Sequence, residues 1–304
     1  MTTAPTAARA GDSLKESPAR KVSVFLSQHA RVRLGLLLSA PLFWLGLVYI
    51  AALAALLITA FWTVDSFTGQ VQTTWTLDNI ITVLTGSLYQ TVTLRTVGVA
   101  LLVTIVDILV ALPIAFFMAK VASPRLQRIL VIAVLMPLWA SYLVKVYAWR
   151  SVLSQGGIAE WIAQPFGGSS PGYGLPATII TLAYLWLPYV ILHIYAGLER
   201  VPNSLLEASS DLGAKTWRTL GSVVLPMLWP AIIAGSIFSF SLSLGDYITV
   251  NIVGGANQLL GNLVYTNVGA ANNLPLAAAI ALIPIAIMIV YLTAARRTGA
   301  LNNL

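Results

Sequence analysis

The stretch VGVALLVTIVDILVALPIAFFMA, residues Val97–Ala119, decides the fold. Its one ionisable residue is Asp107, and the run is long enough to cross a bilayer, which takes roughly 20 residues at 1.5 Å per residue. Five further apolar stretches accompany it: Leu34 to Val64, Ile129 to Val146, Ala177 to Leu198, Val223 to Leu244 and Pro275 to Ala294. The sequence therefore predicts an all-α polytopic membrane bundle of about six transmembrane helices.

The composition agrees with a membrane protein. Of 304 residues, 58% are hydrophobic and 9% are charged, whereas a soluble domain carries roughly 25% charged residues. The net charge of +7 does not indicate nucleic acid, because the basic residues sit at the ends of apolar segments and form no dense patch. Cysteine is absent, which excludes disulfides and thiol chemistry, and two histidines are too few for a histidine-based metal site.

The distribution of Lys and Arg predicts the orientation. If the amino terminus is cytoplasmic, only Arg95, Lys145 and Arg150 of the 17 basic residues fall on the outer side. This asymmetry is what the positive-inside rule requires, so we expect both termini in the cytoplasm. Residues 1–30 are polar and predict a disordered cytoplasmic tail, whereas 31–304 form the transmembrane domain.

The loop at 199–225, placed in the cytoplasm by this orientation, predicts two short helices joined by a turn. Its sequence, continued to Pro226, is ERVPNSLLEASSDLGAKTWRTLGSVVLP. Ser204 and Glu207 have the spacing of a capping box, and Gly213 is placed to end the first helix in a left-handed conformation. A second segment begins near Thr216. A short amphipathic helix with small residues is suited to a partner's groove.

The same loop carries a resemblance to a known family. Glu207-Ala208-Ser209, followed by Gly213, Val223 and Leu225-Pro226, resembles the EAA signature of ABC importer permeases. The family prefers Ala at Ser209 and Ile at Val223, and both departures are conservative. Met136–Trp149 and Ser243–Gly255 are similar to the spermidine/putrescine (PotB-like) branch.

The resemblance implies a type I importer permease fold in the bacterial inner membrane. It also implies an ATPase-coupling segment made of Glu207, Ala208, Ser209, Asp211, Leu212 and Gly213. The implied partners are a second permease subunit, two cytoplasmic ATPase subunits and an external solute-binding protein. We expect no cofactor and no covalent chemistry in this chain, with ATP and magnesium bound by the ATPases. The chain has no phosphate-binding loop of its own, because Gly213-Ala214-Lys215-Thr216 lacks the required Gly-Lys step.

Polar residues in the fifth apolar stretch indicate a candidate substrate pathway. Ser236, Ser239, Ser243 and Asp246 are spaced to share one helical stripe. The stripe is either a pore-lining face, with Asp246 contacting a small cationic substrate, or a helix-packing face. Lys145 is an alternative, permanent partner for Asp246.

Three further residues complete the candidate pathway. Asp107, within the second apolar stretch, either lines the route or is held by a neighbouring helix. Tyr142 and Tyr247 are the candidates for an aromatic cage around an alkylammonium group, although most aromatic residues of this chain suit membrane interfaces and packing.

These observations predict an ABC importer permease, with a polyamine such as spermidine or putrescine as substrate. One alternative is an ion-coupled secondary transporter in which Asp107 and Asp246 bind the coupling ion. Another is an intramembrane aspartyl protease that uses the same two acids as a dyad. Ser243-Leu244-Gly245-Asp246 lacks the first glycine of the protease pattern, and the dyad also requires the acids to share a proton.

Overall fold

A computed structural model describes residues 29–65 and 67–297, so the predicted tail at 1–30 lies almost entirely outside the described residues. Its contacts divide the chain into two units, residues 1–56 and 57–304. The described part of the first unit is one continuous helix. It runs from α2 (Ala30–Phe43) through a π-helical segment, η1 (Trp44–Tyr49), into α3 (Ile50–Ile58).

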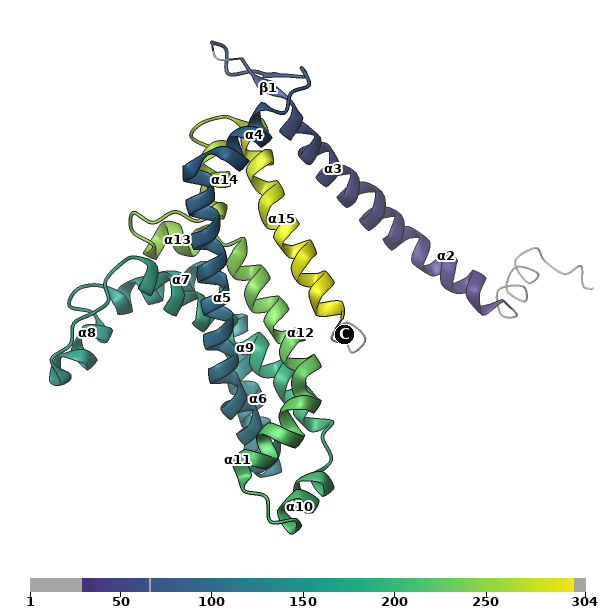
Figure 1. The fold of residues 1–304 in the computed structure, drawn as a ribbon, viewed down its shortest axis with the longest axis vertical. Coiled ribbons are helices and arrows are strands. Elements are labelled where there is room, and N and C mark those ends of the chain that lie inside the picture. The colour runs from purple at the N-terminus through teal and green to yellow at the C-terminus, as the bar shows by residue number, and fades with distance from the viewer. Residues whose placement is uncertain (1–28, 66, 298–304) are drawn as a thin grey trace, which may run out of the picture. The chain divides into compact units, whose positions relative to one another are not determined.

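The second unit contains the remaining elements (Figure 1). Two very short strands, β1 (Thr63–Val64) and β2 (Val71–Gln72), pair antiparallel. The long helices are α5 (Ser87–Phe116), α6 (Pro124–Trp139), α9 (Leu175–Glu199), α12 (Leu225–Leu244) and α15 (Leu274–Arg296). Shorter segments are η2 (Thr59–Phe61), α4 (Asp78–Thr85), η3 (Phe117–Val121), α7 (Tyr142–Leu153), α8 (Ile158–Ala163), η4 (Gln164–Phe166), α10 (Asn203–Asp211), α11 (Thr216–Thr219), η5 (Leu220–Val224), α13 (Ile248–Val253) and α14 (Leu260–Val268).

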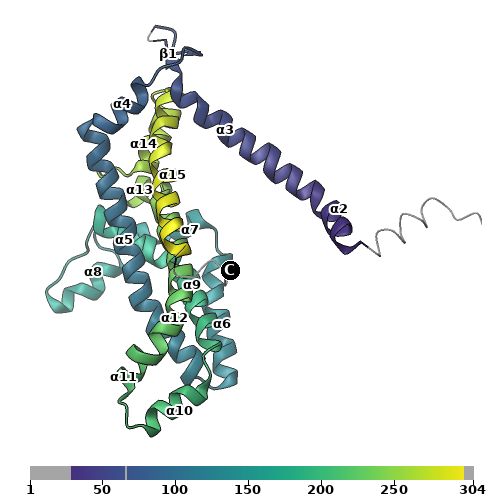
Figure 2. The ribbon, with the colours of Figure 1, turned by 45° about the vertical axis from the view of Figure 1, so that its right-hand side comes forward.

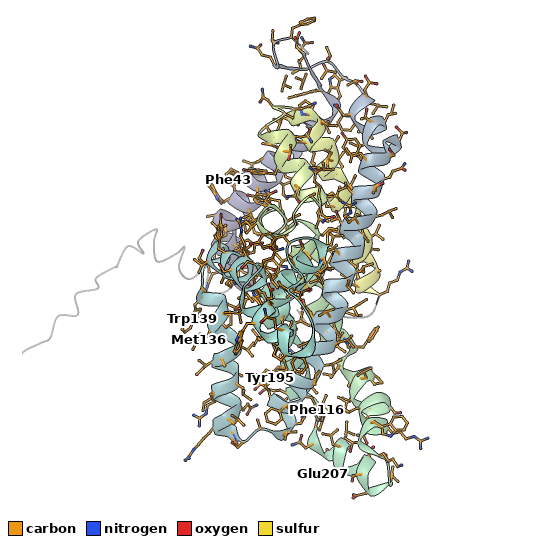
Figure 3. All side chains as sticks on the ribbon, turned by 90° about the vertical axis from the view of Figure 1, so that its left-hand side faces the viewer. Phe43, Phe116, Met136, Trp139, Tyr195 and Glu207 are labelled. Atoms are coloured by element: carbon orange, nitrogen blue, oxygen red, sulfur yellow. The ribbon has the colours of Figure 1, made fainter. Side chains whose placement is uncertain are left out.

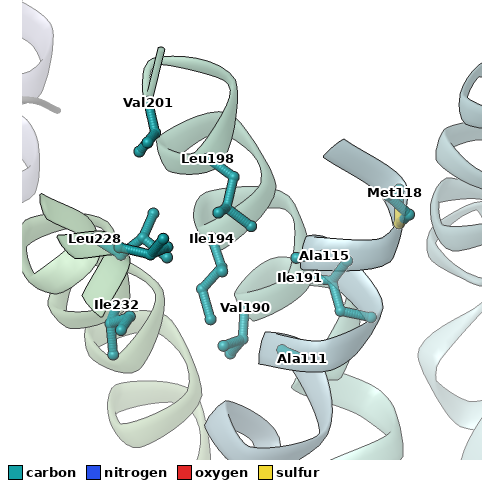
Figure 4. Close-up of a cluster of buried hydrophobic side chains, with 11 residues drawn as sticks. Ala111, Ala115, Met118, Val190, Ile191, Ile194, Leu198, Val201, Leu228 and Ile232 are labelled. Atoms are coloured by element: carbon teal, nitrogen blue, oxygen red, sulfur yellow. The ribbon is translucent and has the colours of Figure 1, made fainter. Parts of the chain in front are cut away.

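Helices α5, α9 and α12 pack against one another and form the centre of this unit (Figure 2). Their shared core is apolar, as Figure 4 shows, and it includes Ala111 and Ala115 of α5, Val190 and Ile194 of α9, and Leu228 of α12. Small residues on α5 let the larger aliphatic side chains of α9 fill the interface, which gives close packing between membrane helices.

The predicted spans are confirmed in five cases. Val32–Phe61, Ser87–Val121, Leu175–Glu199, Thr216–Leu244 and Leu274–Arg296 are each long and apolar enough to cross a membrane. The third predicted span, Ile129 to Val146, is wrong as a single straight helix. The chain bends by 95° between α6 and α7, where Ala140 and Ser141 are extended. Pro137 lies three residues before the break, inside the last turn of α6.

The two ends of the second unit differ in chemistry. We call the end that carries α10 and α11 the elbow end, and the end that carries β1, β2, α4 and α14 the hairpin end (Figure 1). At the elbow end, the Lys120 Nζ atom donates to the Val201 carbonyl oxygen (2.7 Å) and to Asn203 Oδ1 (3.0 Å). The loops after α5 and α9 therefore meet here, and their basic residues gather at one end. That gathering is consistent with a cytoplasmic elbow end, which stays a prediction.

Candidate functional site

The predicted elbow is present as two short helices, α10 and α11, with a turn between them. Gly213 has a φ angle of +76°, as predicted for the residue that ends α10. The Gly213 N–H donates to the Ser210 carbonyl oxygen (2.8 Å), and the Ala214 N–H donates to that of Ser209 (3.1 Å). These two bonds form a Schellman motif, which satisfies carbonyl groups at the end of the helix.

The predicted capping box at the start of α10 is wrong. The residue that precedes the helix is Pro202, and no side chain caps the first turn. The helix begins two residues earlier than the Ser204–Glu207 pattern requires, so Ser204 lies inside the first turn. Glu207 is consequently free of a capping role and projects at the tip of the elbow (Figure 3).

The elbow has an inner and an outer side. Leu206 packs against the core of α5, α9 and α12, and the Ser209 hydroxyl hydrogen-bonds that of Thr219 in α11 (2.8 Å). On the outer side, Leu205 is exposed and Leu212 is 88% exposed. The outward residues Glu207, Ala208, Asp211 and Leu212 are all exposed as well. The arrangement holds the elbow rigidly to the bundle while leaving an apolar and acidic surface uncovered.

A cleft of about 300 Å³ lies towards the hairpin end, where α12 ends and α13 begins. Four side chains in its lining carry chemistry that suits a cation: Tyr142 of α7, Trp186 of α9, and Asp246 and Tyr247 after α12. Tyr142 stacks beside Trp186, with ring centroids 6.0 Å apart and an angle of 24° between their planes. A carboxylate bordered by aromatic faces is the arrangement that binds alkylammonium groups. The structure thus brings three predicted pathway residues, Tyr142, Asp246 and Tyr247, to one cleft.

Three donors from the protein itself orient the Asp246 carboxylate. Oδ2 accepts from the Tyr142 hydroxyl and from the Thr249 hydroxyl (3.2 Å), and Oδ1 accepts from the Thr249 backbone N–H (2.8 Å). Lys145 is not among these partners, so the alternative of a permanent Lys145–Asp246 pair is not realised here. A carboxylate oxygen can accept two hydrogen bonds, which leaves Oδ1 able to accept a further one from a ligand.

Sequence reasoning assigned most aromatic residues to membrane interfaces and packing, and it missed the place of Trp186 in this cleft. The side chain is 9% exposed and its Nε1 has no hydrogen-bond partner among the described residues. Trp186 and Tyr189 are three residues apart on α9 and their rings are in contact, with centroids 6.2 Å apart. That i, i+3 spacing of aromatic residues was the available signal, although in a membrane helix it is also typical of packing.

The remaining pathway candidates lie in helix contacts rather than in the cleft. The Ser239 hydroxyl donates to Asp107 Oδ2 (2.6 Å), and Asp107 is 0% exposed. Ser236 hydrogen-bonds Tyr291 of α15 (2.8 Å), and the buried Ser243 hydroxyl has no hydrogen-bond partner within residues 29–65 and 67–297. In this conformation the serine stripe therefore packs α12 against its neighbours. A role for Ser239, Ser243 and Asp107 in the route stays a prediction.

The two acids are too far apart for a protease dyad. Asp107 contacts Ser239, and Asp246 follows seven residues later. Seven residues correspond to roughly 10 Å along a helix, so the carboxyl groups cannot share a proton. Their hydrogen-bond partners are also entirely different. This geometry removes the aspartyl protease hypothesis.

A bundle of long apolar helices with an elbow at one end is the architecture of a multi-pass membrane protein, and comparison with known proteins identifies its class. Residues 98–298 match the family described as "Binding-protein-dependent transport system inner membrane component". The match covers more than half of the chain, and the chain belongs to this family. It is thus the permease subunit of an ABC importer and a multi-pass inner-membrane protein, as the EAA signature predicted.

Among individual proteins, the chain is 41% identical over 308 residues to the inner membrane ABC transporter permease protein YdcU of Escherichia coli K12. That similarity covers 95% of this chain and 98% of YdcU. The chain is also 32% identical over 212 residues to the spermidine/putrescine transport system permease protein PotB of Haemophilus influenzae. There the similarity covers 68% of this chain and 73% of PotB.

Solved structures share the fold at low sequence identity. A chain of a bacterial alginate ABC transporter, in complex with an alginate pentasaccharide-bound periplasmic protein, superposes with a TM-score of 0.69 at 14% identity. The match covers 92% of this chain and 97% of that one. A chain of the MetNI methionine ABC transporter superposes with a TM-score of 0.53 at 18% identity, and the match covers 70% of this chain and 96% of that one. The predicted permease fold is confirmed. The family assignment replaces the alternative of an ion-coupled secondary transporter.

Proposed function

We propose that this permease carries a polyamine, such as spermidine or putrescine, across the inner membrane. The observation that carries the proposal is the cleft in which Asp246 stands beside Tyr142, Trp186 and Tyr247. A polyamine presents ammonium groups separated by short alkyl segments. The carboxylate suits the charge, and the aromatic faces suit both the charge and the methylene groups. The similarity to spermidine/putrescine permeases supports the same substrate class.

The elbow couples transport to ATP hydrolysis in this proposal. Two ATPase subunits bind ATP and magnesium. One of them binds the exposed side of α10 through Ala208, Leu212 and the acidic Glu207. Because α10 is tied to α11 by the Ser209–Thr219 hydrogen bond, a displacement of α10 passes into α11 and on into α12. A second permease chain completes the pathway and an external binding protein delivers the solute. The helices then rock between outward- and inward-facing states.

Replacement of Asp246 by Asn tests the substrate assignment. The change keeps the shape of the side chain and removes its charge. A hydrogen bond to a charged group contributes about 1.5–3 kcal/mol, so uptake of labelled spermidine at limiting concentration should fall roughly 10- to 100-fold. The matched control is Asp78→Asn, the same chemical change at an exposed carboxyl of α4 outside the cleft, which should retain most uptake.

Assembly must be measured in both variants, by copurification with the ATPase, so that loss of transport is separated from loss of the complex. Unchanged spermidine uptake in Asp246→Asn, with the complex intact, would refute the polyamine proposal. A similar loss in both variants would show that carboxyl groups of this chain act through stability rather than through substrate binding.

A further inference from the structure

One face of α12 carries cavities along much of its length. Towards the elbow end lies a cavity of about 200 Å³. Its lining includes His193 of α9, Arg200 directly after α9, and Met227, Pro230, Ala231 and Ala234 of α12. Towards the hairpin end lies the Asp246 cleft, to which α12 contributes Ser241 and Leu242. We call these the inner cavity and the outer cleft. Residues of both α9 and α12 line each of them, so the two lie one after the other along the same pair of helices.

A continuous series of ring contacts separates the two cavities. Trp186 of the outer cleft contacts Tyr189, and Tyr189 stacks on Phe238 of α12, with centroids 6.1 Å apart and planes at 3°. Phe238 also contacts the ring of His193, which lines the inner cavity, at 4.8 Å. We call Tyr189, Phe238 and His193 the ring stack. It occupies the interval between the outer cleft and the inner cavity.

The helices that carry the ring stack cannot separate easily. At Gly197 an added Cβ would lie 2.5 Å from the Ala231 Cβ atom, and at Gly235 it would lie 3.3 Å from the Val190 Cα atom. These small residues let α9 and α12 approach closely at the level of His193 and on the elbow side of the stack. The stack therefore opens by rotation of a side chain and not by withdrawal of a helix within this chain.

Phe238 is the most exposed member of the ring stack. It is 36% exposed, and a phenyl group makes no hydrogen bond. His193, by contrast, is held by a 2.7 Å hydrogen bond between its Nδ1 and the Tyr189 carbonyl oxygen. Phe238 also belongs to the helix that continues from the elbow, through the π-helical η5, into α12. A π-helical turn is a frequent site of local adjustment, so movement of the elbow can reach Phe238 along one continuous helix.

We propose that the ring stack is the constriction of the transport route in this chain, with Phe238 as its movable element. This inference rests on the proposed function, because it takes the outer cleft as the entry station of the substrate. When stacked, the three rings fill the route and exclude water and ions, in the manner of the hydrophobic constrictions of channels. When Phe238 rotates, the ring faces of Tyr189 and Trp186 stay in place and bind the alkylammonium groups as they pass.

Thiol labelling can test the constriction, because the natural chain has no cysteine and each introduced thiol reports alone. Leu242→Cys places a reporter in the outer cleft and Met227→Cys places one in the inner cavity. The full chain, in membrane vesicles of each orientation, is treated with a membrane-impermeant methanethiosulfonate reagent without ATP. We expect Leu242→Cys to react only from the hairpin side and Met227→Cys only from the elbow side.

Introducing Phe238→Ala into the Met227→Cys variant should abolish this one-sided labelling. The Met227→Cys thiol should then react from the hairpin side at least 10-fold faster than it does behind an intact stack. Phe240→Ala is the matched control, since Phe240 stacks on Tyr291 of α15 and is two residues away on the same helix. The control should leave the sidedness of labelling unchanged.

Labelling of Met227→Cys from both sides with Phe238 intact would overturn the proposal, as would unchanged sidedness after Phe238→Ala. Neither result depends on which solute is transported. Spermidine uptake by Asp246→Asn therefore tests the proposed function separately, and the two hypotheses can fail independently.

Discussion

Substitution of Gly213 gives a graded test of the elbow, because its φ of +76° is the conformation that ends α10. An ideal Cβ at this position would meet no atom within 4 Å, so a side chain is opposed by backbone strain and not by crowding. The left-handed conformation costs an L-residue about 1–2 kcal/mol, less for Asn and more for a β-branched residue. We expect Gly213→Asn to keep the elbow, Gly213→Ala to weaken it and Gly213→Val to weaken it most.

The expected size of the effect follows from these energies. A cost of 1–2 kcal/mol lowers the population of the native turn by roughly 5- to 30-fold relative to alternatives. If an ATPase grips this turn, the ratio of solute transported to ATP hydrolysed should fall in the order Asn, Ala, Val. The assay is paired measurement of uptake and ATPase activity in reconstituted transporter. Equal ratios for Gly213→Val and Gly213→Asn would refute the reasoning, because strain at the turn would then not reach the coupling step.

Two further substitutions test how the bundle is held together. Gly197→Leu should destabilise the chain by about 1–3 kcal/mol, because its Cβ would collide with Ala231. The control Gly98→Leu on α5 meets open space and should be tolerated. Thermal unfolding in detergent compares the two variants, and equal melting temperatures would contradict the close approach of α9 and α12. Asp107→Leu should cost about 1–3 kcal/mol, because it leaves the buried Ser239 hydroxyl without its acceptor, whereas Asp107→Asn retains an acceptor and should cost less. Identical stabilities of the two Asp107 variants would show that the hydrogen bond between α5 and α12 contributes nothing.

Much of the fold could be predicted from the sequence because a bilayer imposes simple rules. Uninterrupted apolar runs of sufficient length give spanning helices, and five of the six predicted spans are present. The third apolar run is divided between α6 and α7, and hydropathy could not show this because it is insensitive to the direction of the chain. Residues on both sides of Ala140 are apolar, so the 95° bend is invisible in composition. Pro137 was a local signal, but prolines within α5, α9, α12 and α15 do not break those helices.

The candidate site was predictable only where local sequence determines geometry. Gly213 could be assigned its conformation because the end of a helix favours glycine there. The partners of Asp246 could not be predicted, because Tyr142 approaches from a helix more than a hundred residues away. The helical spacing placed Ser239 and Asp246 on one stripe. The actual α12 ends at Leu244, so Asp246 turns towards α13 and the cleft, while Ser239 turns towards Asp107.

The most direct test of the account is a crosslink from the exposed side of the elbow. A photoreactive amino acid at Leu212, which is 88% exposed, should capture the ATPase subunit in intact cells, whereas the same probe at the inward-facing Leu206 should not. Capture of the ATPase from Leu212 is the result we predict. Crosslinks from Leu212 only to lipid, or labelling of this position from outside the cell, would contradict the claim that the elbow is where ATP hydrolysis acts on this permease.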